Sequence, residues 1–443
     1  MKNTTLHKVS FFKVLLKTRG ILKNPLPFHN ENFTKHGDSF SISLGKGNPI
    51  IFTRDPIIAK YILQKNNKNY IKSELQTKYL AKYIGNGLLT ASGNYWLQQR
   101  RLIQPAFHKK KLESLMSIML SEIQKQLQKI PKNNSVDVFP IMNDLAFHVV
   151  AKSLFSYTDK GNKIQRLQEI TETVQEMVVK ELRQPFKKWW FQLNGSLKNT
   201  HLLSEESRKI LLEIIEERRL AKSKPDDLLQ MLLDSKYEDG TSMTNEQLID
   251  EILILFVAGH ETTSNALTFS FQLIAKNQEV QDKIREEVEV EVVDNEDILG
   301  SIQQLSFTKQ CIEEAMRLYP PVYFIDRLSI EDDECNGVKI PKGTQVLMSV
   351  YEMHQHKQYW DNAQEFNPDR FHPDRKKEYS ASYFPFGAGP RMCIGNNFAM
   401  YEMILTLAEI VKDYELEPVS KIDINPLITL KPKKAIIRFK SRK

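Results

Sequence analysis

Cysteine is scarce in this sequence: only three occur among 443 residues. Cys311, Cys335 and Cys393 are too few for the disulfide framework of a secreted domain, so a reducing compartment is expected. The sequence also lacks internal repeats, low-complexity tracts and Gly/Ser-rich linkers, which favours one large domain. No basic run is interleaved with aromatic residues as in known nucleic-acid-binding modules, so nucleic acid is not an expected partner.

Acidic residues are absent from residues 1–30, which contain six lysines and arginines in a chain of net charge +7. Lysines interrupt the apolar stretch around Phe11 and Leu16, so this stretch fits neither a secretory signal nor a membrane span. A basic amphipathic segment can lie on an anionic membrane surface. It can equally pack on the domain with its lysines in water. We therefore expect a basic N-terminal segment, 1–30, a single domain, 31–443, and a cytoplasmic protein, peripheral on the inner face of a membrane in the first case.

Helical spacing of apolar residues dominates the pattern, and strand signals lie near both ends of the chain. Residues 39–53 predict two short strands around a turn, followed by a helix capped by Asp55. Apolar residues then recur at helical spacing from 110 to about 316. A final helix is expected at about 394–414, before a strand-like tail. The predicted class is mainly α, with small β-sheets.

Residues 252–275 form a long apolar segment whose only ionisable side chains are His260 and Glu261. As a helix it would be roughly 36 Å long. A membrane span is disfavoured because its polar residues lie at the centre, where charge costs most. A plain core helix is one alternative. The other is a buried helix that brings a carboxylic acid and the Thr262 hydroxyl to an interior site, with the small residue Ala258 allowing a ligand to approach its backbone.

Two further patterns are weak when taken separately. Glu314 and Arg317 share one helical face at a spacing of three residues, which is also common in surface ion pairs. Arg370 lies in an irregular Pro-containing stretch, "FNPDRF". Neither pattern identifies a site alone.

Cys393 lies in "FGAGPRMCIG", a glycine-rich stretch that precedes the last helix. Amides freed by Gly387 and Gly389, and the dipole of the following helix, can stabilise a thiolate. Gly395 would let that helix lie close to a flat ligand. Because no second Cys or His has a spacing suited to zinc, a ligating thiolate implies a cofactor that brings its other ligands, as haem does. A lone cysteine is otherwise most often a small buried hydrophobic residue.

Taken together, these motifs resemble the cytochrome P-450 family of haem-thiolate monooxygenases. "FGAGPRMCIG" matches the family's cysteine signature at every fixed position, and "AGHETT" matches its oxygen-activation motif. "EAMR", "FNPDRF" with Asp369 for Glu, and "WLQQR" match three more motifs, in family order. The likeness runs from about residue 35 to the C-terminus. It implies the cytochrome P-450 fold and haem b as cofactor.

The resemblance assigns roles residue by residue. It makes Cys393 the axial ligand of the haem iron and Glu261 and Thr262 the acid–alcohol pair that delivers protons. It assigns Glu314, Arg317 and Arg370 to a buried structural triad. His260 and Thr263 are expected to be satisfied helical side chains without a catalytic role. The expected haem contacts are Trp96, Arg100, Arg327, Phe386, Arg391, Cys393, Gly395 and Ala258.

The resemblance also implies an activity. A monooxygenase of this family inserts one atom of dioxygen into a C–H or C=C bond. The expected substrate is lipophilic, a fatty acid or a terpenoid. A separate electron donor is implied, a ferredoxin or flavodoxin with its NAD(P)H reductase, and a monomer is expected. A haem-thiolate isomerase or a peroxide-using enzyme, and a non-catalytic haem protein, remain alternatives.

The resemblance also indicates where the substrate pocket, the surface for the electron donor and a lid should lie. The substrate pocket should draw on four segments: 72–90, 252–263, 321–325 and 426–430. Its expected apolar wall comprises Phe256, Val322, Phe324 and Ile428. Basic residues that could steer an acidic donor are Arg101, Lys109, Lys110 and Lys111. Residues 185–194, with Trp189, Trp190 and Phe191, match a mobile lid in the family; they could contact membrane or substrate, or simply pack.

Overall fold

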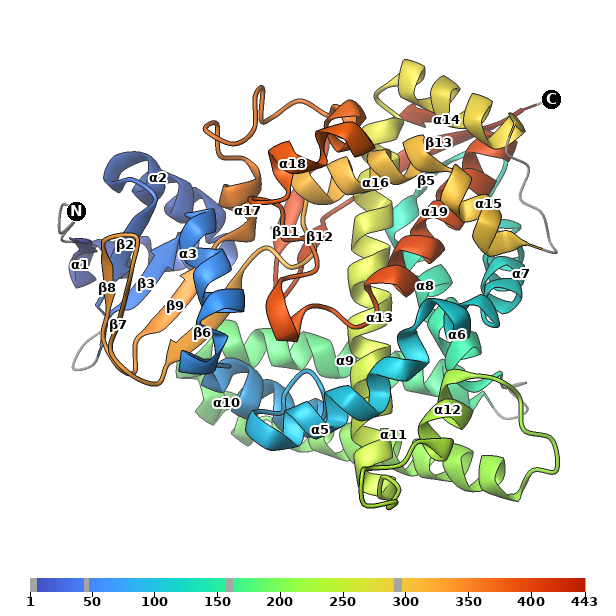
Figure 1. The fold of residues 1–443 in the computed structure, drawn as a ribbon, viewed down its shortest axis with the longest axis horizontal. Helices are drawn as coiled ribbons and strands as arrows, with labels where there is room; N and C mark the ends of the chain where they lie inside the picture. Colours follow the sequence, from blue (N-terminus) through green and yellow to red (C-terminus); the bar gives the residue numbers. More distant parts are fainter. Residues whose placement is uncertain (1–5, 44–47, 157–161, 291–296, 443) are drawn as a thin grey trace.

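A long central helix organises the molecule. The computed structural model describes residues 6–43, 48–156, 162–290 and 297–442, and in it α13 (Asn245–Ile274) crosses the middle of the protein (Figure 1). The helix begins after Thr244, whose side chain forms a reciprocal capping box with Gln247. It therefore starts earlier than the apolar segment at 252 suggested, and it ends at the predicted place.

Helices surround α13 on several sides, as predicted. It packs against α8 (Val138–Phe155), α16 (Ser306–Leu318) and α19 (Asn396–Asp413), and α19 confirms the predicted last helix. The remaining helices are α1 (Phe11–Lys23), α2 (Leu26–His36), α3 (Pro56–Lys60), α4 (Ala81–Ile84), α5 (Gly93–Ile103), α6 (Lys109–Glu113), α7 (Met116–Leu127), α9 (Lys163–Arg183), α10 (Lys188–Leu193), α11 (Ser196–Leu220), α12 (Leu228–Asp234), α14 (Gln278–Val290), α15 (Ile298–Gln304), α17 (Val350–His354) and α18 (Lys376–Tyr379).

A six-stranded mixed sheet lies to one side of α13, with strand order β1-β2-β3-β9-β6-β4 (Figure 1). Its β2 and β3 confirm the two strands predicted in 39–53, and they pair antiparallel with Phe40 opposite Phe52. Asp55 caps α3 by accepting from the Ile57 amide at 2.8 Å, also as predicted. The strands are β1 (His7–Val9), β2 (Ser39–Ile42), β3 (Ile50–Thr53), β4 (Tyr70–Ile71), β6 (Ile325–Ser329) and β9 (Gln345–Met348).

The other strands form three small sheets. One has the order β10-β13-β5, and the other two are the hairpins β11-β12 and β7-β8. The β11-β12 hairpin matters for the site, because β12 packs against α13. The bounds are β5 (Ser135–Asp137), β7 (Asp333–Cys335), β8 (Val338–Ile340), β10 (Tyr414–Pro418), β11 (Ile424–Pro426), β12 (Leu430–Pro432) and β13 (Ile436–Ser441).

The N-terminal segment packs on the sheet from residue 7 onward, whereas residues 1–5 lie outside the described part. Strand β1 pairs parallel with β2, and Lys13 of α1 donates to the Asn32 side chain at 3.0 Å. Phe12 and Leu16 on α1 nevertheless remain 74% and 87% exposed. The segment thus combines a folded inner side with an apolar outer side.

One described helix, α8, has the length and apolar composition of a membrane span. Of that stretch, 61% is buried against the rest of the protein. Core helices of this kind meet the same criteria, so α8 is weak evidence for a span.

Candidate active site

Cys393 lies in a closely folded loop immediately before α19. Gly387 and Gly389 both adopt φ +71°, a left-handed conformation that favours glycine. A Cβ on Gly389 would lie 1.9 Å from the carbonyl oxygen of Leu63, so backbone packs directly on backbone there. The Cys393 amide donates to the Phe386 carbonyl at 2.9 Å and closes the loop. The glycines therefore permit the tight loop that presents the cysteine, while the amide at the sulfur is that of Gly395 and not of Gly387 or Gly389 as predicted.

The Cys393 thiol differs from the other two thiols because it is open to space, whereas Cys311 and Cys335 are buried. The surrounding protein still desolvates Cys393 and raises the pKa of its thiol, while the Gly395 amide and the charge of Arg100 act in the opposite direction. Arg100 also donates to the carbonyl of the neighbouring Met392 at 2.9 Å. A cationic group thus lies close to the sulfur, which suits a thiolate ligand.

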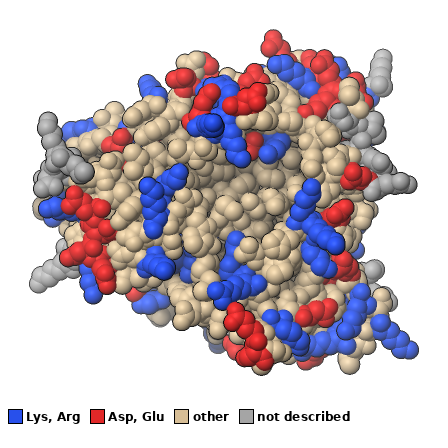
Figure 2. Space-filling model, viewed as in Figure 1, with Lys and Arg blue, Asp and Glu red and all other residues tan. Residues whose placement is uncertain are grey.

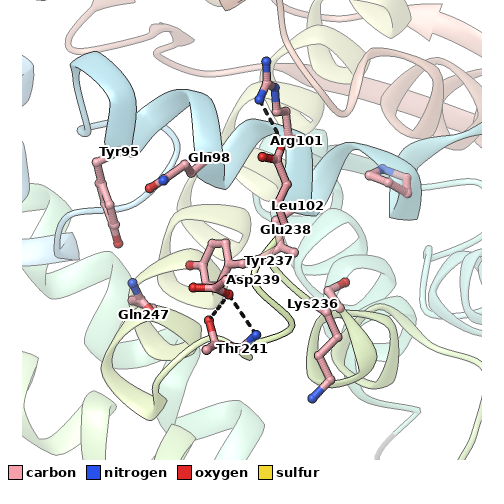
Figure 3. A pocket seen from close by; sticks show the side chains of 12 residues that line it. Tyr95, Gln98, Arg101, Leu102, Lys236, Tyr237, Glu238, Asp239, Thr241 and Gln247 are labelled. Atoms are coloured by element: carbon pink, nitrogen blue, oxygen red, sulfur yellow. Dashed lines mark hydrogen bonds and ion pairs between the residues drawn. The ribbon is translucent and has the colours of Figure 1, made fainter.

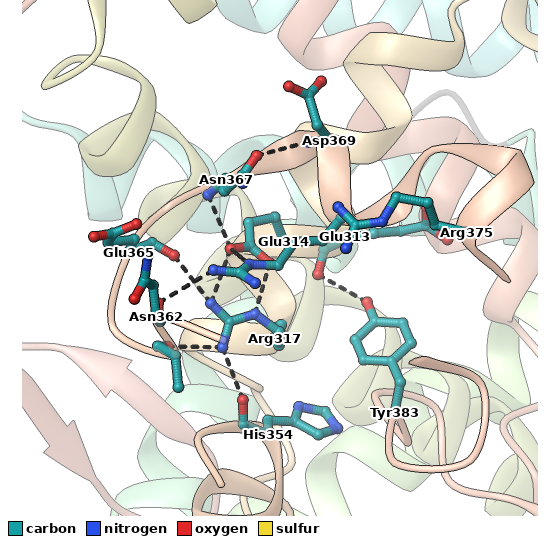
Figure 4. Close-up of polar contacts among 12 residues, drawn as sticks. Glu313, Glu314, Arg317, His354, Asn362, Glu365, Asn367, Asp369, Arg375 and Tyr383 are labelled. Atoms are coloured by element: carbon teal, nitrogen blue, oxygen red, sulfur yellow. Dashed lines mark hydrogen bonds and ion pairs between the residues drawn. The ribbon is translucent and has the colours of Figure 1, made fainter. Parts of the chain in front are cut away.

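Glu314 and Arg317 lie at the centre of a group of buried polar contacts (Figure 4). Arg317 donates two hydrogen bonds to Glu314, at 2.6 and 2.8 Å, and both side chains are completely buried. Arg370 approaches the same carboxylate at 3.4 Å. Arg317 also donates to the carbonyls of His354 and Ala363, both at 2.8 Å. The structure therefore brings together the three residues that the sequence proposed as a triad.

His354 links the triad to the cysteine loop. Its Nε2 accepts the Phe384 amide at 2.9 Å, two residues before Phe386. Burial, with the neighbouring Arg317 charge, lowers the pKa of His354 to about 3, so it is neutral and free to accept. The ring thus connects the ion pair to the backbone that presents Cys393.

Three arginines, Arg100, Arg327 and Arg391, lie close to one another near the cysteine loop. Arg391 stacks on Trp96, its guanidinium carbon 3.7 Å from the ring centroid, and donates to the Ala91 carbonyl at 2.9 Å. Burial and the charges of Arg327 and Arg100 lower the pKa of Arg391 to about 9. Trp96, Arg100, Arg327 and Arg391, all singled out in the sequence, are therefore neighbours.

Lys72 belongs to this group and was not among the residues predicted from the sequence. It is 9% exposed and donates to the Leu89 carbonyl. Burial, then the charges of Arg327 and Arg391, lower the pKa of its ammonium group well below the ordinary value. Its position in "YIKSEL" carries no recognisable pattern, because only the fold brings it beside arginines far along the chain.

This cation cluster fits the two carboxylates of haem. Lys72, Arg100 and Arg391 donate to backbone carbonyls, and Arg327 likewise donates to the Asp326 carbonyl at 2.7 Å. Lys72 and Arg327 are buried, Arg100 and Arg391 are partly buried, and none of these hydrogen bonds goes to a carboxylate that would offset the repulsion between the cations. Anionic ligand groups would supply the missing charge. The donor set therefore fits the two carboxylates of haem.

Across the site, α13 presents a small residue and a hydroxyl. Ala258 is exposed, and Thr262 donates to its carbonyl at 2.7 Å. His260 points the other way: its Nδ1 lies 2.8 Å from the Phe256 carbonyl, and its ring packs edge-on against Phe147. The prediction that His260 is a satisfied helical histidine is confirmed.

Glu261 is buried but not isolated. Thr429 donates to its Oε1 at 2.5 Å, and the Lys431 ammonium lies 3.0 Å from the same oxygen. Glu261, Ile428 and Lys431 line a cavity of about 510 Å³ that also reaches α8 and α9. Sequence reasoning missed Thr429 and Lys431 as partners of the acid, although it placed 426–430 near the site.

The predicted apolar wall is correct only in part. Ile428 lies at the cavity beside Glu261, and Val322 is 39% exposed. Phe256 is wrong as a pocket residue: it is 1% exposed and stacks on Phe147 and Phe155 of α8, at 5.3 and 5.4 Å between ring centroids. Its helical phase turns it toward the core.

The face seen in Figure 2 has a hollow over the middle of α13, with an uncharged floor and basic side chains on its margin. A separate cavity of about 770 Å³ lies between α5 and residues 235–241 (Figure 3). There Arg101 pairs with Glu238 at 3.1 Å. This second cavity is lined mainly by polar residues, and none of them belongs to the cysteine loop.

Comparisons with known proteins agree with this geometry. The family model described as cytochrome P450 matches residues 6–439. Pentalenene oxygenase of Streptomyces avermitilis is 28% identical over 411 residues, covering 92% of this chain and 90% of that protein. Cytokinin hydroxylase of Arabidopsis thaliana is 30% identical, covering 93% and 82%, and cytochrome P450 4A10 of Rattus norvegicus is 32% identical, covering 87% and 80%.

The comparison with solved structures shows the fold. The crystal structure of the cytochrome P450DA heme domain superposes with a TM-score of 0.84 at 21% identity, covering 94% of this chain and 93% of that one. Since a family model matches nearly the whole chain and relatives at 30% identity or above cover most of it, the protein belongs to the cytochrome P450 family and is a haem-dependent monooxygenase.

Proposed function

We propose that this enzyme inserts one oxygen atom into a C–H or C=C bond of a lipophilic substrate, a fatty acid or a terpenoid, with electrons from a separate carrier protein. The acid and hydroxyl on adjacent residues of α13 carry the proposal, since Glu261 is held in place and Thr262 is anchored to a carbonyl of its own helix. Relatives named oxygenase and hydroxylase support oxygen insertion.

Cofactor binding follows from the residues already described. Cys393 would hold the iron, and Lys72, Trp96, Arg100, Arg327 and Arg391 would hold the carboxylates. Ala258 and Gly395 would let α13 and α19 approach the ring, and Phe386, which packs on the core beside the loop, would limit access to the sulfur. When bound, haem supplies dioxygen activation, and the chain supplies position, charge and protons.

Proton delivery is the role of the α13 pair. Thr262 donates to Ala258, so its oxygen can accept a hydrogen bond from a water molecule in the site. Glu261 lies one residue away, at the cavity of about 510 Å³. A proton entering by that cavity can reach the carboxylate and then the hydroxyl. Lys431 and Thr429 hold the carboxylate in that position.

The electron donor is expected to be acidic, a ferredoxin or a flavodoxin with its NAD(P)H reductase. Lys109 and Lys110 are exposed at the start of α6, on the chain that follows α5 and Arg100. Lys111 lies 3.7 Å from Asp226 and Arg101 pairs with Glu238. Of the four predicted steering residues, Lys109 and Lys110 are therefore the better candidates.

We further propose a cytoplasmic monomer that rests on the inner face of an anionic membrane. Phe12 and Leu16 of α1 and Trp189 and Leu193 of α10 are more than half exposed. The two regions adjoin, since Arg183 at the end of α9 donates to the carbonyl of Lys23 at 3.3 Å. Lysines beside apolar side chains suit such a surface.

A substrate screen tests the activity directly. Fatty acids and terpenoids are titrated into the ferric enzyme, and binding is read as the low-spin to high-spin change of the haem spectrum. Compounds that bind are then incubated with dioxygen, NADPH and a ferredoxin or flavodoxin system. Oxygenated product that needs both dioxygen and reductant supports the proposal. Product formed only with peroxide, or no product from any binder, contradicts it.

Thr262→Ala is expected to keep the haem spectrum but to uncouple electron use from product, because the hydroxyl that relays protons is lost. The ratio of product formed to NADPH consumed measures this. The matched control is Thr268→Ala, since Thr268 makes the same backbone bond to Ser264 at 2.7 Å farther along α13. Equal coupling in the two variants would contradict a proton-relay role for Thr262.

A further inference from the structure

Two consecutive acids of α13 hold the loop between α4 and α5. The Asn86 amide donates to Asp250 at 2.7 Å, and the Leu88 amide donates to Glu251 at 2.9 Å. Both carboxylates are buried, at 7% and 1% exposure. We call residues 85–91 the clamped loop. Its attachment to α13 thus depends on two side-chain-to-amide bonds at alternate residues.

The sequence of the clamped loop is fitted to these carboxylates. Gly85 adopts φ +80°, and a Cβ there would lie 2.0 Å from an Asp250 oxygen. A Cβ on Gly87 would lie 2.8 Å from the Glu251 carboxyl carbon. Glycine at both positions lets the backbone rest directly on the acids. The backbone of residues 85–87 therefore packs directly against the side chains of Asp250 and Glu251, and larger residues than glycine at 85 and 87 would prevent this contact.

The opposite side of the clamped loop carries the cation cluster. The Leu89 carbonyl accepts from Lys72, and the Ala91 carbonyl accepts from Arg391 at 2.9 Å. Thr90 closes the loop by donating to the Gly85 carbonyl at 2.7 Å. The Asn86 and Leu88 amides thus face α13, while the Leu89 and Ala91 carbonyls, two residues apart, accept hydrogen bonds from the cation cluster.

The two acids are not equivalent. Asp250 is neutralised by Arg208, which donates to it at 2.6 Å. Glu251 has no cationic partner among the described residues, and its Oε1 has no hydrogen-bond partner there. Burial, with the Asp250 charge adding and the Leu88 amide opposing, raises the pKa of Glu251 to about 7. Burying a charged acid without a counter-ion is costly, so its carboxyl favours the protonated form.

We propose that Asp250 and Glu251 are positioning residues for the cofactor: by clamping loop 85–91 they set the Leu89 and Ala91 carbonyls that orient Lys72 and Arg391 toward the haem carboxylates. This proposal rests on the assignment of the cation cluster to those carboxylates. Neither acid needs to touch the cofactor, so their effect on haem is transmitted through the loop backbone.

The experiment measures two properties of the haem-loaded enzyme and its variants: hydrogen exchange at the Asn86 and Leu88 amides, and the rate of haem loss to excess apomyoglobin. Glu251→Leu removes the acceptor, and Gly87→Ala displaces the loop without altering either acid. Both are expected to expose the Leu88 amide and to accelerate haem loss about tenfold, the effect of about one strong hydrogen bond. Glu251→Gln keeps an acceptor oxygen and is expected to restore both values.

Controls separate this effect from general destabilisation. Glu122→Leu removes a buried acid of α7 that is 5% exposed, and Gly20→Ala adds a Cβ with no atom within 4 Å. Neither is expected to change Leu88 exchange or haem loss. If either control accelerates haem loss as much as Glu251→Leu does, the effect is unspecific and the proposal fails.

Arg391→Gln separates the role of the cation cluster from the role of the clamped loop. If it leaves haem loss unchanged, the cation cluster does not hold the haem carboxylates and the underlying assignment is overturned. If it accelerates haem loss while Glu251→Leu and Gly87→Ala expose Leu88 without doing so, only the positioning role is overturned. Faster haem loss with unchanged Leu88 exchange would also contradict transmission through the loop.

Discussion

Glu314 and Glu251 are both fully buried acids beside the cofactor site, yet their surroundings differ. Glu314 receives two hydrogen bonds from Arg317, the nearby charge of Arg370 and the Asn367 amide at 2.9 Å. Glu251 receives one amide and leaves one oxygen unpaired among the described residues. The first acid supports the rigid side that presents Cys393. The second holds a loop through a single amide, and burial raises the pKa of its carboxyl.

Glu314→Ala is expected to give the largest effect. It leaves Arg317 buried without its partner, which costs about 3–5 kcal/mol of the free energy of unfolding. Denaturant unfolding of the haem-loaded protein measures it. Glu74→Ala, which breaks an exposed pair with Lys78, is the control and should cost less than about 1 kcal/mol. Similar values for both variants would contradict a supporting role for the triad.

Glu251→Gln tests how the charge of Glu251 affects the free energy of unfolding at different pH values. In the wild type, the pKa of Glu251 is raised from an ordinary 4.5 to about 7, so the folded state binds more protons than the unfolded state between these values. Its contribution to stability therefore falls as pH rises from about 4.5 to 7 and is constant above that. The glutamine cannot ionise, so the variant is expected to gain up to about 3 kcal/mol over the wild type across this window.

The measurement is the difference in unfolding free energy between Glu251→Gln and wild type at several pH values. Taking the difference cancels the titration of all groups that both proteins share. These include the groups nearest Glu251: Asp250, which pairs with Arg208, and the tyrosines Tyr95 and Tyr237, whose pKa values are raised by burial. A difference that does not vary between pH 4.5 and 8 would contradict this account of Glu251.

Smaller losses of stability are expected when either of two glycines in the cysteine loop is replaced by alanine. Gly387 and Gly389 share φ +71°, so alanine suffers the same backbone strain at both, about 1 kcal/mol. Only Gly389→Ala also meets a backbone oxygen at 1.9 Å, whereas Gly387→Ala meets its nearest atom at 3.8 Å. We expect a loss of about 2–3 kcal/mol for Gly389→Ala and about 1 kcal/mol for Gly387→Ala. Equal losses for the two variants would show that the backbone at Leu63 moves to accommodate the added methyl group, contradicting the predicted difference.

The same contrast explains what could be predicted from the sequence. Cys393 and the residues around it, and Glu314 with Arg317, lie in short segments whose spacing alone carries the pattern. Pairings between distant segments could not be read in this way: Glu251 with Leu88, Glu261 with Lys431, and Lys72 with Arg391 depend on how helices and loops meet in space. These contacts form only when distant segments pack together, so no local sequence pattern predicts them.

Phe256 shows a second reason why the site could not be fully predicted from the sequence. Its apolar character and its place on α13 suggested a pocket wall, but the helix presents only one side to the site. Ala258 and Thr262 lie on that side, and Phe256 lies on the side that packs against α8. The fold decides which apolar residue of a buried helix becomes core and which becomes lining.

The most direct test of the central claim is the absorbance spectrum of the reduced protein with carbon monoxide. Ligation of the iron by the Cys393 thiolate predicts the red-shifted Soret band of haem-thiolate proteins, and Cys393→Ala should abolish it. The buried thiol Cys311 serves as control, since Cys311→Ala should keep the band. A wild-type spectrum without the red-shifted band, or one that survives Cys393→Ala, would contradict the account.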